Sequence, residues 1–129
     1  MPLKLNVNRG EKFIVNGAVI KNDGDGISLL FENQAQILRQ KDILTQETAK
    51  TPAARVYLAL QCAYLFPDKA ASHLEDFNRL LDEYLEAAPS ARPTAQEIRA
   101  FIEEGQVYGA LKTCCQLLGH EQEVLAHVQ

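Results

Sequence analysis

The sequence lacks any apolar run close to the roughly 20 residues that a membrane-spanning helix needs. It also turns polar at Lys4 and Asn6, where a signal peptide would begin its apolar core. Cysteine is scarce, because Cys62, Cys114 and Cys115 are odd in number and lie in apolar, helix-like sequence. These absences argue against a membrane partner and against a disulfide framework. We therefore expect a soluble protein that stays in the reducing cytoplasm.

Residue sets that serve catalysis or metal binding are missing as well. No phosphate-binding loop of the form GxxxxGK[ST] or GxGxxG occurs. The stretch around Asp23 and Asp25 lacks the twelfth-position glutamate of a calcium loop, so a hairpin turn is favoured there. Cys114 and Cys115 would point about 100° apart on a helix and could not easily share a metal with His120. We expect one of these cysteines in the core and the other partly exposed, and we predict no catalytic residue, metal or cofactor.

The chain also lacks the excess of Lys and Arg with which proteins bind nucleic acid through bulk electrostatics. Its formal net charge is −4. The charge is unevenly distributed, because residues 1–46 carry six bases against five acids, a net of +1, whereas residues 47–129 carry seven bases against twelve acids, a net of −5. An anionic partner would therefore meet less repulsion at the N-terminal part.

What the N-terminal part does contain is the period of two that marks β-strands. Apolar Leu3, Leu5 and Val7 alternate with polar residues, and Asn16-Gly17 is the dipeptide best suited to a two-residue hairpin. Residues 1–46 are therefore expected to form a β-rich module, a five-strand antiparallel meander or small barrel for binding or dimerisation. The five strands are predicted over residues 3–8, 12–15, 18–21, 27–31 and 35–39.

The rest of the chain, residues 51–129, has helical periodicity. Thr51 is expected as an N-cap before Pro52 at the first helical position. Thr94 and Glu97 resemble a capping box, and Gly119 is expected to end the helix that they begin. The predicted helices cover residues 51–66, the stretch between 68 and 89, and 94–118, with a short or frayed helix from 121. The expected fold class is thus α+β, a small five-stranded antiparallel β module followed by a three- to four-helix bundle.

Basic and amide side chains cluster near the two ends of the β-rich module. If the first and last strands pair, these side chains line one ridge that can contact the phosphates of RNA. The alternative is that the charges are ordinary edge-strand residues that discourage aggregation. The candidate RNA-binding residues are Lys4, Asn6, Asn8, Arg9, Lys12, Arg39 and Lys41.

Four strings of the sequence occur in a specific order and spacing. They are residues 10–13 (GEKF), 16–19 (NGAV), 38–44 (LRQKDIL) and 51–57 (TPAARVY). Together they resemble the FlbT family of flagellar biosynthesis regulators over most of the chain. The resemblance implies a post-transcriptional regulator that acts on the 5′ untranslated leader of flagellin mRNA, lowers flagellin synthesis and promotes decay of the message.

A second likeness concerns the N-terminal module alone. Its first strand, the Gly10-Glu11 bend, the short β segments and the exit through Asp42-Ile43 are similar to the carbon storage regulator family. That resemblance implies a strand-exchanged homodimer in which the first and last strands of two chains form each RNA site. Aligned in this way, Gln40 stands where the family has an arginine. Arg39 comes one place early, which would put its side chain on the opposite face of a strand unless a bulge restored it.

These observations lead to one leading hypothesis and one alternative. The leading hypothesis is a non-catalytic regulator that binds the flagellin mRNA leader through the β-rich module, as a homodimer, with the helical part as support. The alternative is a protein-binding flagellar assembly factor or a flagellin-binding, chaperone-like module. In that case grooves between the helices would hold flagellin or another flagellar factor.

Overall fold

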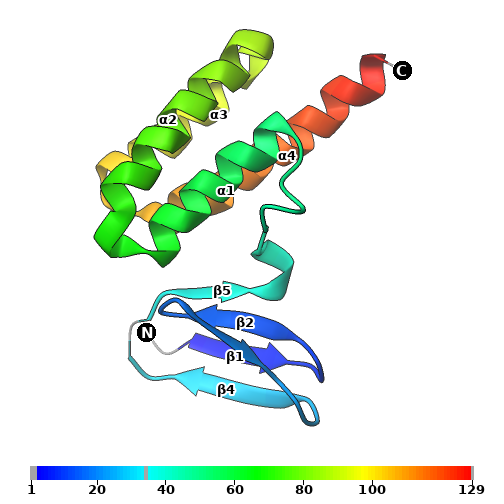
Figure 1. Ribbon diagram of the computed structural model, residues 1–129, viewed down its shortest axis with the longest axis vertical. Coiled ribbons are helices and arrows are strands. Elements are labelled where there is room, and N and C mark those ends of the chain that lie inside the picture. The colour runs from blue at the N-terminus through cyan, green and yellow to red at the C-terminus, as the bar shows by residue number, and fades with distance from the viewer. Residues whose placement is uncertain (1–2, 34, 129) are drawn as a thin grey trace. The chain divides into compact units, whose positions relative to one another are not determined.

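The computed structural model describes residues 3–33 and 35–128, with side chains described as far as residue 124. The chain divides into two units, Met1–Ile43 and Leu44–Gln129, which we call the β unit and the helical unit. Five antiparallel strands and then four α-helices make up the described part of the chain (Figure 1). The fold class is therefore α+β, as predicted.

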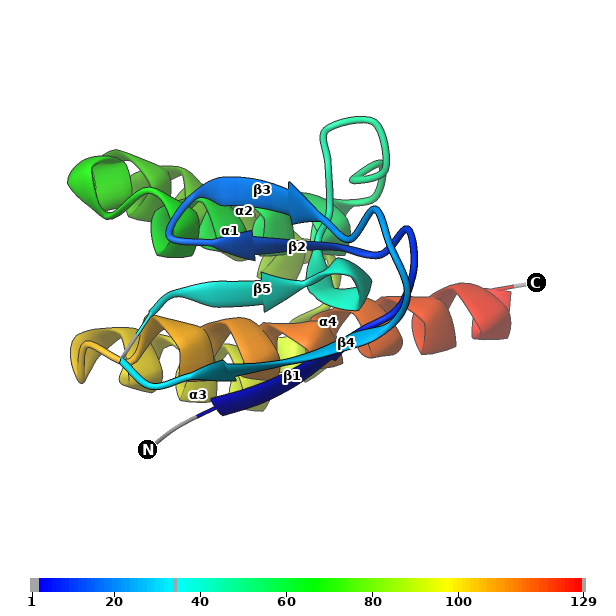
Figure 2. The same cartoon turned by 90° about the horizontal axis from the view of Figure 1, so that it is seen from below.

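The strands of the β unit form two small antiparallel sheets instead of one meander (Figure 2). One sheet pairs the first strand with the fourth, and the other has the order β3-β2-β5. Of the two predicted arrangements, meander or small barrel, the meander is therefore wrong, and the first and last strands do not pair with each other. The strands are β1 (Leu3–Val7), β2 (Lys12–Val15), β3 (Ala18–Lys21), β4 (Ile27–Phe31) and β5 (Ile37–Arg39).

The two-sheet arrangement is explained by the need to bury the apolar side chains of β1 together with those of β2 and β5. Leu5 and Val7 of β1 are each 2% exposed and pack with Phe13 of β2 and Ile37 of β5. A flat meander would have left one face of these strands in water, whereas two facing sheets enclose a core. This core is small, so the β unit has little apolar burial to stabilise it.

Two turns hold the sheets in register. The predicted hairpin between β2 and β3 is confirmed, with φ of +48° at Asn16 and +86° at Gly17. Before β4, the buried amide of Asn22 donates to the carbonyl oxygens of Val7 at 3.1 Å and Asp25 at 2.9 Å. The side chain of Asn22 thereby joins the end of β1 to the turn that precedes β4.

The helical unit is a bundle in which α1 packs on α2 and α4, and α3 packs on α4. Thr51 is the predicted N-cap of α1, and its Oγ1 accepts a hydrogen bond from the backbone N–H of Ala54 at 3.2 Å. Phe77 and Leu81 of α2 are fully buried. None of the described helices combines the length and the hydropathy that crossing a bilayer would require. The helices are α1 (Pro52–Leu65), α2 (Ala70–Ala87), α3 (Arg92–Glu103) and α4 (Val107–Val128).

Where one helix was expected over residues 94–118, the chain forms two. Gly105 has a φ of +77°, its N–H donates to Ile102 at 3.0 Å, and the N–H of Gln106 donates to Phe101 at 2.9 Å. This pair of bonds is a Schellman motif, which ends α3. The sequence pattern did not reveal the break, because the apolar spacing continues on both sides of it.

Three other expectations for this stretch are wrong. The helix begins at Arg92 with Ala91 as its N-cap, so Thr94 already lies inside the first turn and caps nothing. Gly119 does not end a helix, because α4 continues through it to Val128. The residues from 121 on therefore extend α4 and do not form a separate short helix. Tertiary packing outweighs the modest cost of one helical glycine.

Replacing Gly105 by alanine is expected to lower the free energy of unfolding of the helical unit by about 1–2 kcal/mol, because an L side chain is strained at positive φ. Gly119→Ala is the matched control. An added Cβ at Gly119 meets no atom within 4 Å, so this change should stabilise the unit by about 0.5–1 kcal/mol. Chemical denaturation followed by circular dichroism measures the free energy of unfolding of both variants. Equal changes in the same direction would contradict the conclusion that α3 ends at Gly105.

Candidate functional site

A cavity of about 120 Å³ opens on the surface of the β unit. It is built where the end of β1, the bend after it, the start of β2 and the end of β5 come together. Most of its lining residues are polar, and three of them are basic. The lining residues are Leu5, Asn6, Val7, Asn8, Glu11, Lys12, Phe13, Arg39, Gln40 and Lys41.

The bend between β1 and β2 shapes one wall of this cavity. Gly10 has a φ of +79°, which L side chains rarely adopt, and its N–H donates to the carbonyl of Asn22 at 2.7 Å. The N–H of Asn22 donates in return to the carbonyl of Glu11 at 3.0 Å. This reciprocal pair of bonds holds the bend, and with it the side chains on either side, in a defined conformation.

The end of β5 shapes the other wall. The strand stops at Arg39, opposite Phe13 of β2, and Gln40–Asp42 then form a 3-10 turn (η1). Arg39, the last residue of β5, lines the cavity together with Gln40 and Lys41 of the turn.

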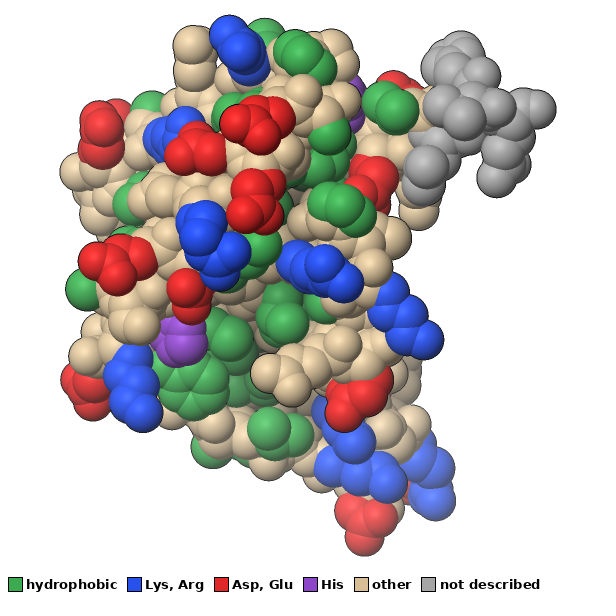
Figure 3. Space-filling model, turned by 45° about the horizontal axis from the view of Figure 1, so that its top comes forward, with side chains coloured by type: hydrophobic (Ala, Val, Ile, Leu, Met, Phe, Trp, Pro, Cys, Tyr) green, Lys and Arg blue, Asp and Glu red, His purple; other side chains and the backbone are tan. Residues whose placement is uncertain are grey.

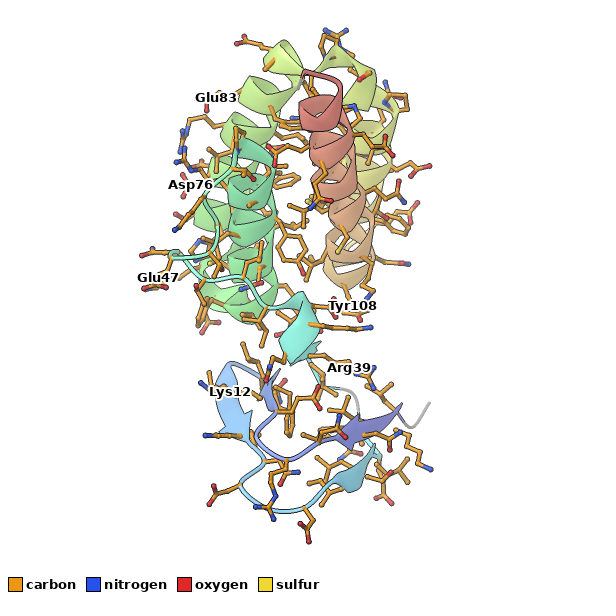
Figure 4. The ribbon with its side chains drawn as sticks, turned by 90° about the vertical axis from the view of Figure 1, so that its right-hand side faces the viewer. Lys12, Arg39, Glu47, Asp76, Glu83 and Tyr108 are labelled. Carbon is orange, nitrogen blue, oxygen red and sulfur yellow. The ribbon has the colours of Figure 1, made fainter. Side chains whose placement is uncertain are left out.

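The structure brings five of the seven candidate RNA-binding residues together around this cavity. They meet although the first and last strands do not pair with each other, because each of the two strands ends at the cavity. Figure 4 shows Lys12 and Arg39 on the adjacent strands β2 and β5. The five are Asn6, Asn8, Lys12, Arg39 and Lys41.

The remaining two candidates, Lys4 and Arg9, do not line the cavity. Lys4 is the second residue of β1, opposite the exposed Leu30 of β4. Arg9 lies in the bend, where its Nη2 forms an ion pair with Oδ1 of Asp25 at 2.7 Å. Both side chains of that ion pair are largely exposed, so it contributes little to stability. The pairing nevertheless reduces the positive charge that Arg9 offers to a ligand.

The electrostatics of the cavity favour an anion. Lys12, Arg39 and Lys41 are exposed, and none of them forms an ion pair with a described residue. The one carboxylate, that of Glu11, accepts a hydrogen bond from the backbone N–H of Asn8 at 2.8 Å. Three cations and one carboxylate leave the cavity with a net charge of +2.

Sequence reasoning missed the two other polar residues of this cavity, Gln40 and Glu11. Gln40 is held in place, because its Oε1 accepts a hydrogen bond from the backbone N–H of Lys12. The only sequence signals were that Gln40 stands where the carbon storage regulator family has arginine in the alignment given above, and that Glu11 belongs to the Gly10-Glu11 bend. Neither signal shows that these side chains meet basic residues from both ends of the β unit.

The helical unit has a larger but electrically balanced groove of about 410 Å³ between α2 and α3. Asp82 and Glu86 lie on the α2 wall, and Arg92 and Arg99 lie on the α3 wall. Two acids and two bases leave no net charge, and Nη2 of Arg99 is already paired with Oδ1 of Asp82 at 2.8 Å. This groove is the place where the protein-binding alternative would act.

Acidic and basic side chains also lie intermingled over the helices on the face drawn in Figure 3. Two ion pairs on α2 are part of this pattern, because Arg79 reaches both Asp76 and Glu83 at 3.7 Å. All three side chains are more than half exposed, so these pairs are weak. Such a surface gives RNA no patch of one sign to bind.

The cysteines of α4 are packing residues. Cys114 is fully buried and Cys115 is partly exposed, which confirms the expected division between core and surface. Burial, and to a lesser extent the neighbouring Cys115, raise the pKa of the Cys114 thiol to about 12. A buried thiol with a raised pKa is a poor nucleophile.

His120 is engaged in a network at one end of the helical unit. Its Nδ1 lies 2.7 Å from the hydroxyl of Tyr84, and its Nε2 lies 2.7 Å from Oγ of Ser90. The neighbouring Glu121 accepts a hydrogen bond from the backbone N–H of Ala53 at 3.0 Å, near the start of α1. The network ties α4 to α1, to α2 and to the turn before α3, which is a structural role.

Burial, and then the charge of Glu121, raise the pKa of Tyr84 to about 12, against about 10 for a tyrosine in the unfolded chain. Because the folded-state pKa is the higher one, this contribution to stability is complete below pH of about 10 and is lost as the pH rises through about 12. Urea denaturation between about pH 10 and pH 12 should show this decrease in the free energy of unfolding, and the decrease should be smaller in Tyr84→Phe. An equal decrease in the variant would contradict the assignment of the effect to Tyr84.

Comparison with known proteins places these observations in a family. The chain matches the family described as flagellar protein FlbT over residues 3–125. It is 39% identical to the probable flagellum biosynthesis repressor protein FlbT 1 of Bradyrhizobium diazoefficiens, over 96% of this chain and 85% of that protein. It is 36% identical to the corresponding protein of Rhodopseudomonas palustris strain TIE-1, over 98% and 99% of the two chains.

A third relative is the flagellum biosynthesis repressor protein FlbT of Caulobacter vibrioides strain CB 15. The identity is 34%, over 99% of this chain and 92% of that protein. No solved structure matches the chain.

Proposed function

This chain belongs to the FlbT family of flagellar proteins, and from that premise we propose that it regulates flagellin synthesis after transcription. It does so by binding the 5′ untranslated leader of flagellin mRNA, which blocks translation or promotes decay of the message. The relatives are named as repressors of flagellum biosynthesis, and that name supports the direction of the effect.

The observation that carries the proposal is the cavity of the β unit. Lys12, Arg39 and Lys41 present exposed cationic groups around it, and no described residue neutralises them by an ion pair. Exposed cationic side chains contact phosphates, and the amides of Asn6 and Asn8 can add hydrogen bonds to sugar or phosphate oxygens. A single-stranded leader follows such a concave surface more readily than a stiff duplex.

The proposed mechanism needs no catalytic group. An occupied leader segment cannot pair with the ribosome or form its own secondary structure, so binding alone changes translation and exposure to nucleases. The helical unit is acidic, and its net charge is unsuited to phosphate contacts. The protein acts in the cytoplasm, where the message is translated.

We also propose that the protein works as a homodimer that pairs through the β unit. The β unit has a small core, and it exposes several large apolar side chains, Val19 and Ile20 on the edge strand β3 among them. Unpaired edges of this kind favour association between chains. Sedimentation at micromolar concentration should give the mass of two chains, and a monomeric mass would contradict the dimer.

Binding of the purified protein to a flagellin leader at two salt concentrations tests the proposed function. With about three phosphate contacts to a single strand, the logarithm of affinity should fall with a slope of about −2 against the logarithm of salt concentration. The affinity should then drop roughly 20-fold between about 50 mM and 200 mM salt. Absence of binding at the lower concentration would refute the RNA function.

The groove between α2 and α3 favours a second candidate function, the holding of flagellin or another flagellar factor. Its volume of about 410 Å³ exceeds that of the cavity in the β unit, and it has acidic and basic walls. If purified flagellin binds while the leader does not, and Arg92→Glu weakens that binding, the protein-binding function is the correct one. Arg92 is exposed, so its replacement should leave the fold intact.

A further inference from the structure

Gln40 presents a fixed hydrogen-bond donor at the cavity of the β unit. Its amide oxygen accepts from the backbone N–H of Lys12, and a backbone N–H can only donate, so the orientation of the amide is determined. The amide nitrogen is then the free end of the side chain. It has no hydrogen-bond partner among the described residues, and Gln40 is exposed, so both of its N–H groups are available to a ligand.

Glu11 presents a fixed acceptor in the same cavity. One carboxylate oxygen accepts from the backbone N–H of Asn8 at 2.8 Å, and the side chain is partly buried. An ionised carboxylate has about four acceptor positions, so the bond to Asn8 leaves most of its capacity unused. The two side chains, Gln40 and Glu11, therefore place a donor and an acceptor in one cavity of about 120 Å³.

The cavity offers no aromatic surface on which a base could stack. Phe13 is the one aromatic residue in its lining, and only 4% of that residue is exposed. Stacking on aromatic side chains is the sequence-tolerant way of holding single strands. Without it, a base that enters this cavity has to be recognised through its edge, and phosphates through Lys12, Arg39 and Lys41.

We propose that Gln40 and Glu11 select an unpaired keto base, uracil or guanine, over an amino base, cytosine or adenine. Uracil presents its O4 acceptor beside the N3–H donor, and guanine presents O6 beside N1–H, which the donor of Gln40 and the acceptor of Glu11 can satisfy together. Cytosine and adenine present an amino donor beside a ring-nitrogen acceptor, so they meet the same two groups only when the base is turned over and its sugar lies on the other side. The inference rests on the proposed RNA-binding function and specifies the ligand of the same site.

Oligouridine and oligocytidine of equal length test the selection, because the two bases differ at the N3 and C4 positions that form this edge. At low salt the protein should bind oligouridine about tenfold more tightly, since a matched pair of hydrogen bonds discriminates against the wrong base. Gln40→Glu keeps an oxygen for the N–H of Lys12 but turns the free donor into an acceptor. It should abolish the preference.

The ratio of the two affinities is the readout, because the added negative charge weakens both complexes alike. Gln36→Glu is the matched control, since it makes the same change in the same unit at a residue outside the cavity lining, and it should preserve the preference. Glu11→Gln is a second variant for the case that Gln40→Glu does not fold. It should reduce the preference as well.

The outcomes separate this inference from the proposed function. If the unmodified protein binds neither oligonucleotide at low salt, the RNA-binding function fails, and the base selection fails with it. If it binds both equally, or if Gln40→Glu and Glu11→Gln both leave the ratio unchanged, the selection is wrong while RNA binding stands. Loss of the preference in either folded cavity variant, but not in Gln36→Glu, supports the selection.

Discussion

Replacing both Arg39 and Lys41 by alanine is expected to weaken binding of the flagellin leader on the order of a hundredfold at low salt. Each change removes one hydrogen bond to a charged group, worth about 1.5 kcal/mol, from the cavity of the β unit. The dependence on salt should become shallower, from a slope of about −2 to a slope of about −0.7, because two of three phosphate contacts are lost. Filter binding or fluorescence anisotropy over a salt series measures both quantities.

The thermal unfolding midpoint of this double variant should stay nearly unchanged, because both side chains are exposed and pair with no described acid. Lys50→Ala with Lys69→Ala is the matched control, since these two exposed lysines lie in the helical unit. The control should retain the affinity of the unmodified protein. An equal loss in both double variants would mean that the protein attracts RNA through overall charge, and the site assignment would be wrong.

Replacing Asn22 by alanine is expected to unfold much of the β unit and to abolish leader binding, although Asn22 does not line the cavity. Its amide donates to the carbonyls of Val7, Asn8 and Asp25 and also accepts from the N–H of Gly24. Leaving buried backbone groups unsatisfied costs about 1–3 kcal/mol each. The small core of the β unit gives it too little stability to remain folded after a loss of this size in the free energy of unfolding.

Amide hydrogen exchange measures this effect within the intact protein. Protection should be lost in the β unit of Asn22→Ala and retained in the helical unit. Asn33→Ala is the matched control, because Asn33 is exposed and its replacement should leave both protection and leader binding unchanged. Retained protection around β1 and β4 in Asn22→Ala would show that the network of Asn22 does not hold the two sheets together.

The local elements were largely predictable from the sequence. Asn16-Gly17 predicted the hairpin, because both of its residues tolerate positive φ. Thr51 predicted the start of α1, because its hydroxyl and the following proline suit the first helical turn. Each of these signals acts over a few neighbouring residues, so no knowledge of the rest of the chain was required.

The end of α3 at Gly105 and the continuation of α4 through Gly119 could not be predicted from local sequence signals. Both glycines follow helical sequence, yet Gly105 has positive φ and ends α3, whereas Gly119 is helical. A glycine permits a stop without requiring one. Which of the two stops a helix depends on how α3 and α4 pack against each other, and packing is a property of the folded unit.

The sequence by itself determined the residue types of the candidate site, because the strand period and the basic side chains near both ends of the β unit are visible in the chain. Only the tertiary structure decided that Lys12, Arg39 and Lys41 meet at one cavity while Arg9 is paired with Asp25. The reason is that strand pairing joins residues far apart in the chain. Side-chain alternation specifies which face a residue occupies, but it does not specify which strand becomes its neighbour.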